Sequence, residues 1–365
     1  MTKQNTTYHP LGDYIRPVDI RNRDLKVTTL VGLTIEKAFI PSVANIIGTD
    51  LSNYKIIRRN QFACSLMQVS RDGKIPVAMF TEKEAIMSPA YPMFEVTDTS
   101  LLLPEYLMMW FSRPEFDREA SYYAVGGVRG SLTWEDFCAM RIPVPPIAEQ
   151  RAIVAEYEAV QNRINVAKRM IATLQATAQA LYRKMFVDGI DKENLPEGWR
   201  WGTLGEVCEF KYGKMADKHL KSEEYPFPIY SGYAVTGYTD ICMFENPIVV
   251  IIARGDAGTG RICYSPKQCF LSNLAIAILP KDERFKQYLY FHLQDADTES
   301  LRSGSAQAQI TINSLEPFEI LTPKASVYSK FTSQADVIFN NIDICEKEIE
   351  KLTEIQTIIL SRMGR

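Results

Sequence analysis

The chain has 365 residues, which is more than one ordinary domain, so two or three domains are expected. Its composition of 46% hydrophobic and 23% charged residues excludes a disordered or low-complexity chain, and its net charge of -3 lacks the overall basic signature of a nucleic-acid-binding protein. The apolar runs are far shorter than the roughly 20 residues of a membrane helix, no secretory signal opens the chain, and the seven cysteines contain no Cys-x-x-Cys pair, so we expect a cytoplasmic protein with reduced thiols.

Residues 1–146 are expected to form a first globular domain of the α+β class. Basic side chains dominate its first half, because the segment from Arg16 to Lys74 holds ten Lys and Arg against five Asp and Glu. A short helix is predicted from Glu105 to Phe111. The uneven charge indicates that one face of this domain is basic, although the chain as a whole is not.

A long helix is predicted at residues 147–187, after Pro145 and Pro146. Its apolar residues recur at alternating spacings of three and four, which is typical of a coiled-coil seam. The seam consists of Ile153, Tyr157, Val160, Ile164, Ala167, Ile171, Leu174, Ala178, Leu181 and Met185. A helix of about 40 residues is roughly 60 Å long, which exceeds an ordinary domain helix and indicates that the seam packs on another helix.

A polar linker at 188–194 separates this helix from a second globular domain at 195–322. Short β-rich runs predict its strands, at 227–230, 248–253, 261–264 and 275–279, and a short helix is predicted at 285–293. The glycine run from Gly255 to Gly260 resembles a nucleotide-binding loop, but a strand-like segment follows it, so we interpret it as a hairpin loop. Four lysines near the start of the domain, Lys211, Lys214, Lys218 and Lys221, form a second basic cluster.

A second long helix, at 323–365, repeats the pattern of the first. Its seam runs through Ala335, Ile338, Ile342, Cys345, Ile349, Leu352, Ile359 and Met363 and is broken only by Gln356. The two halves align at an offset of 178 residues, at which Gly126 matches Gly304 and Met185 matches Met363. We therefore predict an α+β fold of two globular domains, each followed by a long α-helix, with the helices pairing as an antiparallel coiled coil with pseudo-two-fold symmetry.

Catalytic machinery is not evident in the sequence. The three histidines, His9, His219 and His292, have no metal-ligand or triad spacing. No phosphate-binding Gly-x-x-x-x-Gly-Lys-Ser/Thr motif occurs, and neither does the Asn-Pro-Pro-aromatic or Asp-Pro-Pro-aromatic signature of adenine methylation. We expect a non-catalytic chain without a cofactor or a metal of its own.

The order of motifs resembles the specificity subunits of Type I restriction-modification systems along essentially the whole chain. The motifs that carry the resemblance are Ile142–Pro146, Glu149–Arg151, Leu181–Phe186, Leu195–Trp199 and Pro228–Gly232. Each is weak alone, whereas their order, with a long helix after each domain, is specific. The second helix departs from the pattern, because residues 323–326 lack the Pro-Pro and Glu-Gln of the first, which weakens the second copy of any contact made by those residues.

The resemblance implies a division of labour within a larger complex. Each domain would recognise one half of a split, asymmetric site in double-stranded DNA, and the paired helices would fix the number of unread bases between the halves. The helices would also dock two modification subunits, which bring S-adenosylmethionine and methylate adenine. Restriction subunits would add ATP-dependent translocation and cleavage, with ATP and Mg²⁺ bound on those partners.

Exposed polar loops are the places to expect DNA contacts, because base edges and phosphates are contacted by donors, acceptors and cations. The candidates in the first domain are Arg21, Asn22, Arg23, Gln68, Arg71, Lys74 and Arg129. The candidates in the second domain are Lys211, Tyr212, Lys214, Tyr230, Ser231, Tyr233, Arg254, Ser303, Gln307 and Gln309. Those beside Gly126 and Gly304 occupy corresponding places in the two halves.

Three other functions stay open. The chain could be the specificity partner of a bifunctional restriction-methylation enzyme, a coiled-coil adaptor whose domains bind proteins, or an enzyme with an unfamiliar site. Candidate partners in gel filtration would distinguish the first, and salt-dependent DNA affinity of the assembled complex would count against the second.

Overall fold

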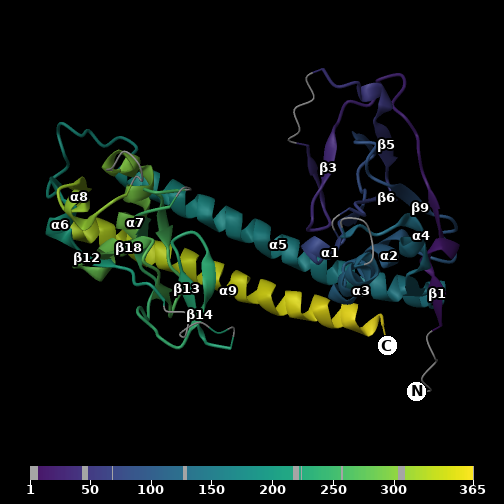
Figure 1. The fold of residues 1–365 in the computed structure, drawn as a ribbon. Helices are drawn as coiled ribbons and strands as arrows, with labels where there is room; N and C mark the ends of the chain where they lie inside the picture. The colour runs from purple at the N-terminus through teal and green to yellow at the C-terminus, as the bar shows by residue number, and fades with distance from the viewer. Residues whose placement is uncertain are drawn as a thin grey trace. The chain divides into compact units, whose positions relative to one another are not determined.

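The computed structural model describes residues 7–42, 48–67, 69–125, 130–216, 222, 224–255, 258–302 and 309–364 (Figure 1). The chain divides into two compact units. Unit 1 is Met1–Ala167 with Glu348–Arg365, and unit 2 is Lys168–Lys347. Each unit therefore contains one globular domain and a part of each long helix.

Unit 1 is built on an antiparallel sheet of order β2-β9-β6-β7. These strands are Ile15–Pro17, Met93–Val96, Gln61–Cys64 and Val77–Met79. A second layer holds β5 and β8, at Lys55–Arg58 and Glu84–Met87, and the hairpin β3–β4, at Val31–Leu33 and Phe39–Pro41. The helices are α1 at Val69–Asp72, α2 at Pro104–Phe111, α3 at Pro114–Ala124, α4 at Trp134–Ala139 and the start of α5, which spans Ile147–Phe186.

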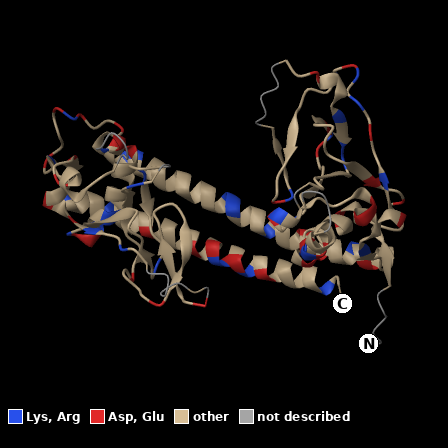
Figure 2. Cartoon of the chain, viewed as in Figure 1, with Lys and Arg blue, Asp and Glu red and all other residues tan. Residues whose placement is uncertain are grey.

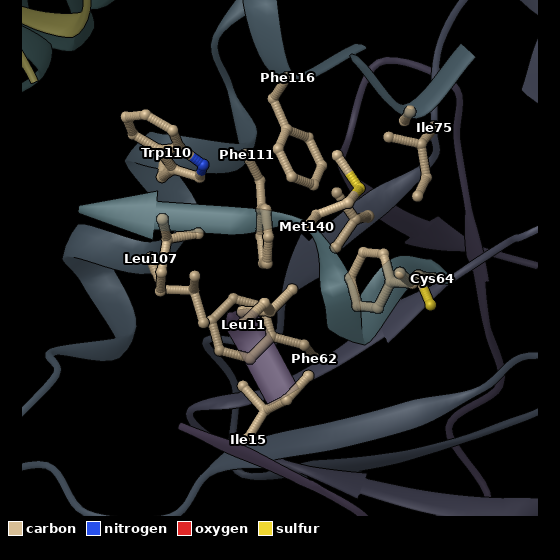
Figure 3. Packing of buried hydrophobic residues seen from close by; sticks show 14 of the residues in the cluster. Leu11, Ile15, Phe62, Cys64, Ile75, Leu107, Trp110, Phe111, Phe116 and Met140 are labelled. Atoms are coloured by element: carbon tan, nitrogen blue, oxygen red, sulfur yellow. The ribbon is translucent and has the colours of Figure 1, made fainter. Parts of the chain in front are cut away.

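The core of unit 1 lies between this sheet and its helices. Phe62 stacks on Phe94 with ring centroids 5.0 Å apart, and Phe111 of α2 meets both rings edge-on. Figure 3 shows Phe62, Phe111, Leu11 and Met140 converging on this centre from four different segments. Strand β1 at Tyr8–Pro10 pairs with β10 at Arg141–Pro143, which brings the start of the domain to the strand that precedes α5.

Unit 2 is built on an antiparallel sheet of order β12-β18-β15-β16. These strands are Cys208–Tyr212, Ala275–Pro280, Val249–Ile252 and Ile262–Tyr264. A second layer has the order β14-β13-β17, at Val235–Thr239, Phe227–Tyr230 and Phe270–Leu271. The remaining elements are β11 at Arg200–Thr203, α6 at Leu204–Val207, α7 at Lys286–Asp295, η6 at Thr298–Leu301, α8 at Ile312–Leu315, β19 at Glu319–Thr322 and α9 at Ala325–Arg362.

The same topology thus occurs twice. The sheets have equivalent strand orders, and the pair β1–β10 of unit 1 corresponds to β11–β19 of unit 2. Thr133 caps α4 by accepting a hydrogen bond from the Asp136 amide, and Thr311, 178 residues later, caps α8 through the Ser314 amide. The internal repeat predicted from the sequence is a structural repeat, and the predicted α+β fold is confirmed. The glycine run is also a hairpin connection, because β15 and β16 flank it and pair antiparallel.

The two long helices pack in opposite directions within each unit. In unit 1, Ile359 and Met363 near the end of α9 enter the core beside Val154 of α5. In unit 2, Ala178, Tyr182 and Phe186 near the end of α5 enter the core beside Phe331 and Ala335 of α9. The end of one helix therefore always meets the start of the other, and their pairing is antiparallel.

The break in the second seam has a structural partner. Gln356, which replaces an apolar seam residue, donates a hydrogen bond from its side chain to Gln161 Oε1 of α5 at 2.8 Å. Nearby, Arg163 forms an ion pair with Glu348 at 2.5 Å. A polar pair within an apolar seam favours one register of two helices, since a shifted register would place these partly buried amide groups against apolar side chains.

The first turn of each long helix is tied to its domain. Gln150 is fully buried, and its side-chain amide donates to the carbonyls of Leu101 and Pro145 and accepts from the Leu103 amide. The corresponding residue in α9 is Tyr328, whose hydroxyl donates to Asp282 at 2.8 Å. Leu103 precedes α2, and Asp282 caps the turn before α7, so both contacts join the long helix to the equivalent short helix of its domain. The contact that the sequence suggested was weakened in α9 is therefore present, with a tyrosine and a carboxylate in place of an amide.

Replacing Gln150 with alanine is expected to destabilise unit 1 by about 1–3 kcal/mol, because three buried backbone groups lose their partner. The free energy of unfolding by urea measures this loss. Gln175, an exposed residue of α5, is the matched control, and its alanine variant should lie within about 0.5 kcal/mol of the wild type. Equal stabilities of the two variants would contradict the anchoring role.

Unit 2 should lose stability in acid because it buries a neutral histidine. Nδ1 of His292 on α7 lies 3.3 Å from the Tyr182 hydroxyl of α5 and 3.2 Å from the Tyr288 hydroxyl. Burial lowers the pKa of His292 to about 4, with a smaller contribution from Lys192. Because the unfolded chain takes up this proton near pH 6.5 and the folded chain does not, stability present above pH 6.5 is lost as the pH falls toward 4.

The expected loss from this one residue is about 2 kcal/mol between pH 7.5 and pH 5. Urea unfolding of the wild type and of His292→Asn, which carries a neutral amide, isolates it from the titration of carboxylates. The difference between the two proteins should shrink as the pH falls. A difference independent of pH would show that His292 takes up its proton at the same pH in the folded and the unfolded protein.

Candidate nucleic-acid interface

One end of the main sheet of unit 2 gathers segments that are distant in sequence. Strand β12 ends at Tyr212, and the chain continues through Gly213 to Lys214, whose backbone amide donates to the Leu271 carbonyl at 2.8 Å. Gly213 lies so close that a Cβ atom there would be 2.0 Å from the Ser272 carbonyl oxygen. Only glycine lets the extension of β12 run against the start of β18.

The turn after β13 lies at the same end of the sheet. The Ser272 amide donates to the Tyr230 carbonyl at 2.9 Å. Gly232 has a φ of +100°, which favours glycine, and a Cβ atom there would be 2.8 Å from Cγ1 of Ile252. This turn places Tyr233, a 55% exposed aromatic side chain, beside the ends of β12 and β15.

The segment after β15 completes the cluster. Arg254 forms an isolated antiparallel bridge with Gln309, and the Ile310 amide donates to the Ala253 carbonyl at 2.8 Å. The Tyr212 hydroxyl accepts a hydrogen bond from the Ile312 amide at 3.1 Å, at the start of α8. The structure therefore brings five predicted residues to one place, and we call them the unit 2 edge: Tyr212, Lys214, Tyr233, Arg254 and Gln309.

Two predicted contacts in this region instead hold the turn. Ser231 is fully buried, and its hydroxyl donates to the Ala234 carbonyl and accepts from the Ala234 amide. Tyr230 is half-buried, its hydroxyl donates to the Gly232 carbonyl, and burial raises its pKa above the usual range. Their side chains shape the turn that exposes Tyr233.

The cations of this region are free to meet an anion. Lys211, Lys214 and Arg254 are exposed and form no ion pair with the residues that the structure describes. In Figure 2, Lys and Arg positions and Asp and Glu positions are distributed along the ribbon of both units, so overall charge does not set this region apart. Lys218 and Lys221 of the predicted lysine cluster lie outside the described residues.

Unit 1 has an equivalent place. The Leu132 amide donates to the Leu66 carbonyl at 2.8 Å, and Leu132 corresponds to Ile310 of unit 2. Arg71 follows Leu66 on α1, and Gly130, with a φ of +69°, lies so close that its Cβ would be 2.0 Å from Ser70 Oγ. Arg71 and the end of the first glycine loop are thus neighbours, as Arg254 and Gln309 are in unit 2.

Two predicted cations of unit 1, Arg71 and Lys74, form ion pairs, unlike Lys211, Lys214 and Arg254 of unit 2. Arg71 pairs with Asp72 at 2.7 Å, and Lys74 pairs with Glu36 at 3.3 Å. Both pairs are exposed, and such pairs contribute at most about 1 kcal/mol, so a phosphate can replace the carboxylate.

The predicted residues Arg21, Asn22 and Arg23 meet around Asn53. Arg21 donates to the Asn53 carbonyl and Arg23 to the Asn53 side chain, and Arg21 also pairs with Asp19 at 2.5 Å. The hydrogen bond from Arg21 lowers the pKa of Asp19. Asn22 is only 1% exposed and bonds to both backbone groups of Val27, so it holds the loop and leaves the surface to Arg21 and Arg23.

Four predicted contact residues lie outside the described part of the chain. They are Gln68, Arg129, Ser303 and Gln307. Arg129 belongs to the first glycine loop, and Ser303 and Gln307 belong to the second. Their positions stay predictions.

The sequence search missed an exposed aromatic group at the end of α3. Tyr122 is 77% exposed, its neighbour Tyr123 is also exposed, and their ring centroids are 5.9 Å apart. They lie just before the first glycine loop. The two adjacent tyrosines before a glycine run are visible in the sequence. They were not predicted as contacts because only polar and cationic residues were considered in this domain.

The described residues offer no alternative catalytic centre. No group of three His, Cys, Asp or Glu side chains among them could hold a metal ion. None of the helices in the described part of the chain has the length and apolar character that crossing a membrane requires.

Comparison with known proteins adds three findings. Residues 196–356 match the family described as Type I restriction modification DNA specificity domain. The putative type I restriction enzyme MjaX specificity subunit of Methanocaldococcus jannaschii is 20% identical over 361 residues, covering 92% of this chain and 84% of that protein. The type I restriction enzyme HindI specificity subunit of Haemophilus influenzae is 24% identical over 216 residues, covering 53% of this chain and 47% of that protein.

A solved structure shares the fold along the whole chain. The Type-I restriction-modification system S subunit from M. genitalium matches with a TM-score of 0.64 at 17% sequence identity, covering 100% of this chain and 98% of that one. The family match covers the second domain, and the repeated topology extends the same architecture to the first.

Proposed function

We propose that this chain, a specificity subunit of the Type I restriction-modification family, uses each of its two domains to recognise one half of a split site in double-stranded DNA. The family is generally non-catalytic, and its role is DNA recognition. The observation that carries the proposal is the repeat: in both units the same end of the main sheet carries predicted contact residues, with Arg71 in unit 1 and Arg254 in unit 2.

The unit 2 edge has the chemistry that DNA recognition needs. Lys214 and Arg254 supply positive charge for phosphates, together with the neighbouring Lys211 on β12, while Gln309 can both donate to and accept from a base edge. Tyr233 adds an exposed ring that can pack on a sugar or a base. In unit 1, Arg21, Arg23, Arg71 and Lys74 supply the cations, and the glycine loop carries Arg129.

The antiparallel helices connect the two DNA-recognition domains. Their length fixes the number of unread bases between the half-sites, and their outer faces dock two modification subunits. Exposed apolar residues on α9, such as Val337 and Ile344, suit such contacts. Restriction subunits join in the full complex, which acts on DNA in the cytoplasm.

The chemistry itself belongs to the partner subunits. This chain needs no cofactor for recognition, S-adenosylmethionine binds to the modification subunits, and ATP and Mg²⁺ bind to the restriction subunits. The specificity chain positions the adenine, and the modification subunits methylate it.

Exchange of one domain tests the proposal. The Leu11 amide donates to the Met140 carbonyl, and the Leu204 amide donates to the Phe318 carbonyl, so these bonds mark where each domain closes. Replacing residues 204–318 with the same segment of another specificity subunit should change one half of the methylated motif completely and leave the other half unchanged. Replacing residues 11–140 should do the reverse. A change in both halves from one exchange would refute the assignment of one half-site to each domain.

A further inference from the structure

Unit 2 contains a groove that DNA recognition does not explain. It has a volume of about 710 Å³ and runs along β16 and the following Ser265–Lys267 segment. Helix α7 forms its second wall with Gln287 and Tyr290, and α9 forms its third with Asp336 and Phe339. All of these residues belong to unit 2.

The groove lies along an open sheet edge. Among the described residues, only β15 pairs with β16, so the other side of β16 has no strand partner. An open edge with a groove beside it is the structure to which an extended peptide adds as a further strand.

In unit 1, the hairpin β3–β4 contacts residues on either side of β7, the equivalent edge strand. Phe39 of the hairpin β3–β4 packs edge-on against Phe80, which follows β7, with ring centroids 5.2 Å apart. Lys37 of the same hairpin bonds to the Phe111 carbonyl and pairs with Asp117 at 2.8 Å, and Asp117 in turn accepts from the Ile75 amide just before β7. The segment from Lys37 to Phe39 therefore lies near both ends of β7. Its basic side chain, Lys37, pairs with the carboxylate of Asp117.

The groove of unit 2 has acceptors without a matching donor. Gln287 is 3% exposed, and its amide nitrogen donates to Asp336 at 3.0 Å and to the Tyr264 hydroxyl at 3.3 Å. Its amide oxygen has no hydrogen-bond donor among the described residues. Asp336 is exposed and has no cationic partner there, whereas Asp343 pairs with Lys267 and Lys347.

Aromatic rings surround this acceptor pair. Tyr264 stacks on Phe339 with centroids 5.5 Å apart and meets Tyr290 edge-on at 5.2 Å. Ring faces and an unpaired carboxylate together favour a guanidinium or an ammonium group. The basic residues of the groove lie elsewhere on its wall or are paired, as Lys286 is with Glu283.

We propose that this groove binds an extended, basic segment of the modification subunit, which adds as a strand to β16 and places an Arg or Lys side chain on Asp336. The proposal rests on the proposed function for the identity of the partner. It assigns a binding site to the second domain, whereas in the first domain the hairpin β3–β4 contacts residues on either side of the equivalent strand.

The test uses the full chain coexpressed with its modification subunit. A photo-cross-linking amino acid at Asn340, on the α9 wall of the groove, should cross-link to one modification-subunit peptide that contains Arg or Lys. In the purified complex, Asp336→Arg should weaken the affinity between the subunits by about tenfold or more, and Asp336→Asn should weaken it less.

The control is Glu209→Arg, which makes the same reversal at an exposed position of β12, at the opposite edge of the sheet from β16 and outside the groove, and should leave the affinity unchanged. A stable complex in which Asn340 forms no cross-link to the modification subunit, or in which Asp336→Arg binds like the wild type, would overturn the groove proposal alone. Failure of the wild-type chain to form any complex with the modification subunit would overturn the proposed function as well.

Discussion

Replacing Phe331 with alanine is expected to lower the free energy of unfolding of unit 2 by about 3–5 kcal/mol. Phe331 is fully buried on α9, where its ring meets Tyr182 and Phe186 of α5 and Phe291 of α7. The loss is large because one side chain joins both long helices to the domain, and no neighbouring segment can fill the cavity without moving. Urea unfolding followed by circular dichroism measures it.

Ile344→Ala provides the matched control on the same helix. Ile344 is 62% exposed, so its truncation should change the free energy of unfolding by no more than about 0.5 kcal/mol. Similar losses in the two variants would contradict the packing of α9 against α5 and α7.

Removing the unpaired cations of unit 2 is expected to weaken DNA binding by about 100-fold in the assembled complex. The variant carries Lys211→Ala, Lys214→Ala and Arg254→Ala together. Because each phosphate contact releases counterions, the slope of log affinity against log salt should also fall by about 3. Titration of a fluorescent duplex at several salt concentrations measures both quantities.

The control for this variant removes the same charge elsewhere. Lys192, in the linker, and Lys330 and Lys351, on α9, are exposed. None of them belongs to the strands and loops that form the unit 2 edge. Their triple alanine variant should bind DNA within about threefold of the wild type, since distant exposed charges are screened. Equal losses in the two triple variants would mean that the unit 2 edge makes no specific contribution.

The helices and the repeat could be predicted because their signals are periodic. The ten apolar seam residues between Ile153 and Met185 alternate at spacings of three and four. An offset of 178 residues aligns them with the seam of α9. No single substitution erases such a signal. The break at Gln356 was visible too, but its partner Gln161 was not, because a contact between two helices requires the register between them.

The second anchor could not be predicted because its chemistry differs. The sequence shows that α9 lacks the Glu-Gln of α5, and this absence suggested a weaker contact. In the structure, Tyr328 occupies the place of Gln150 and reaches Asp282, which precedes it by 46 residues. Equivalent positions in a repeat can keep a function while the residue types change.

The clustering of the candidate DNA-contact residues was predicted only in part. Arg254, Gln309, Lys214 and Tyr212 come together because the loops that carry them leave the same end of one sheet. Asn22 and Ser231 were chosen for the same polar character, yet both are buried and stabilise turns. Composition does not distinguish a polar side chain that bonds to its own loop from one that faces solvent.

We propose that this chain directs a methyltransferase to a two-part DNA sequence. This is tested by coexpressing the chain with the modification subunit encoded beside it and mapping adenine methylation in the host DNA by single-molecule sequencing. We expect one split, asymmetric motif with two defined halves and a fixed number of unread bases between them. A stable complex that leaves the DNA unmethylated, or that methylates one uninterrupted motif, would contradict this proposal.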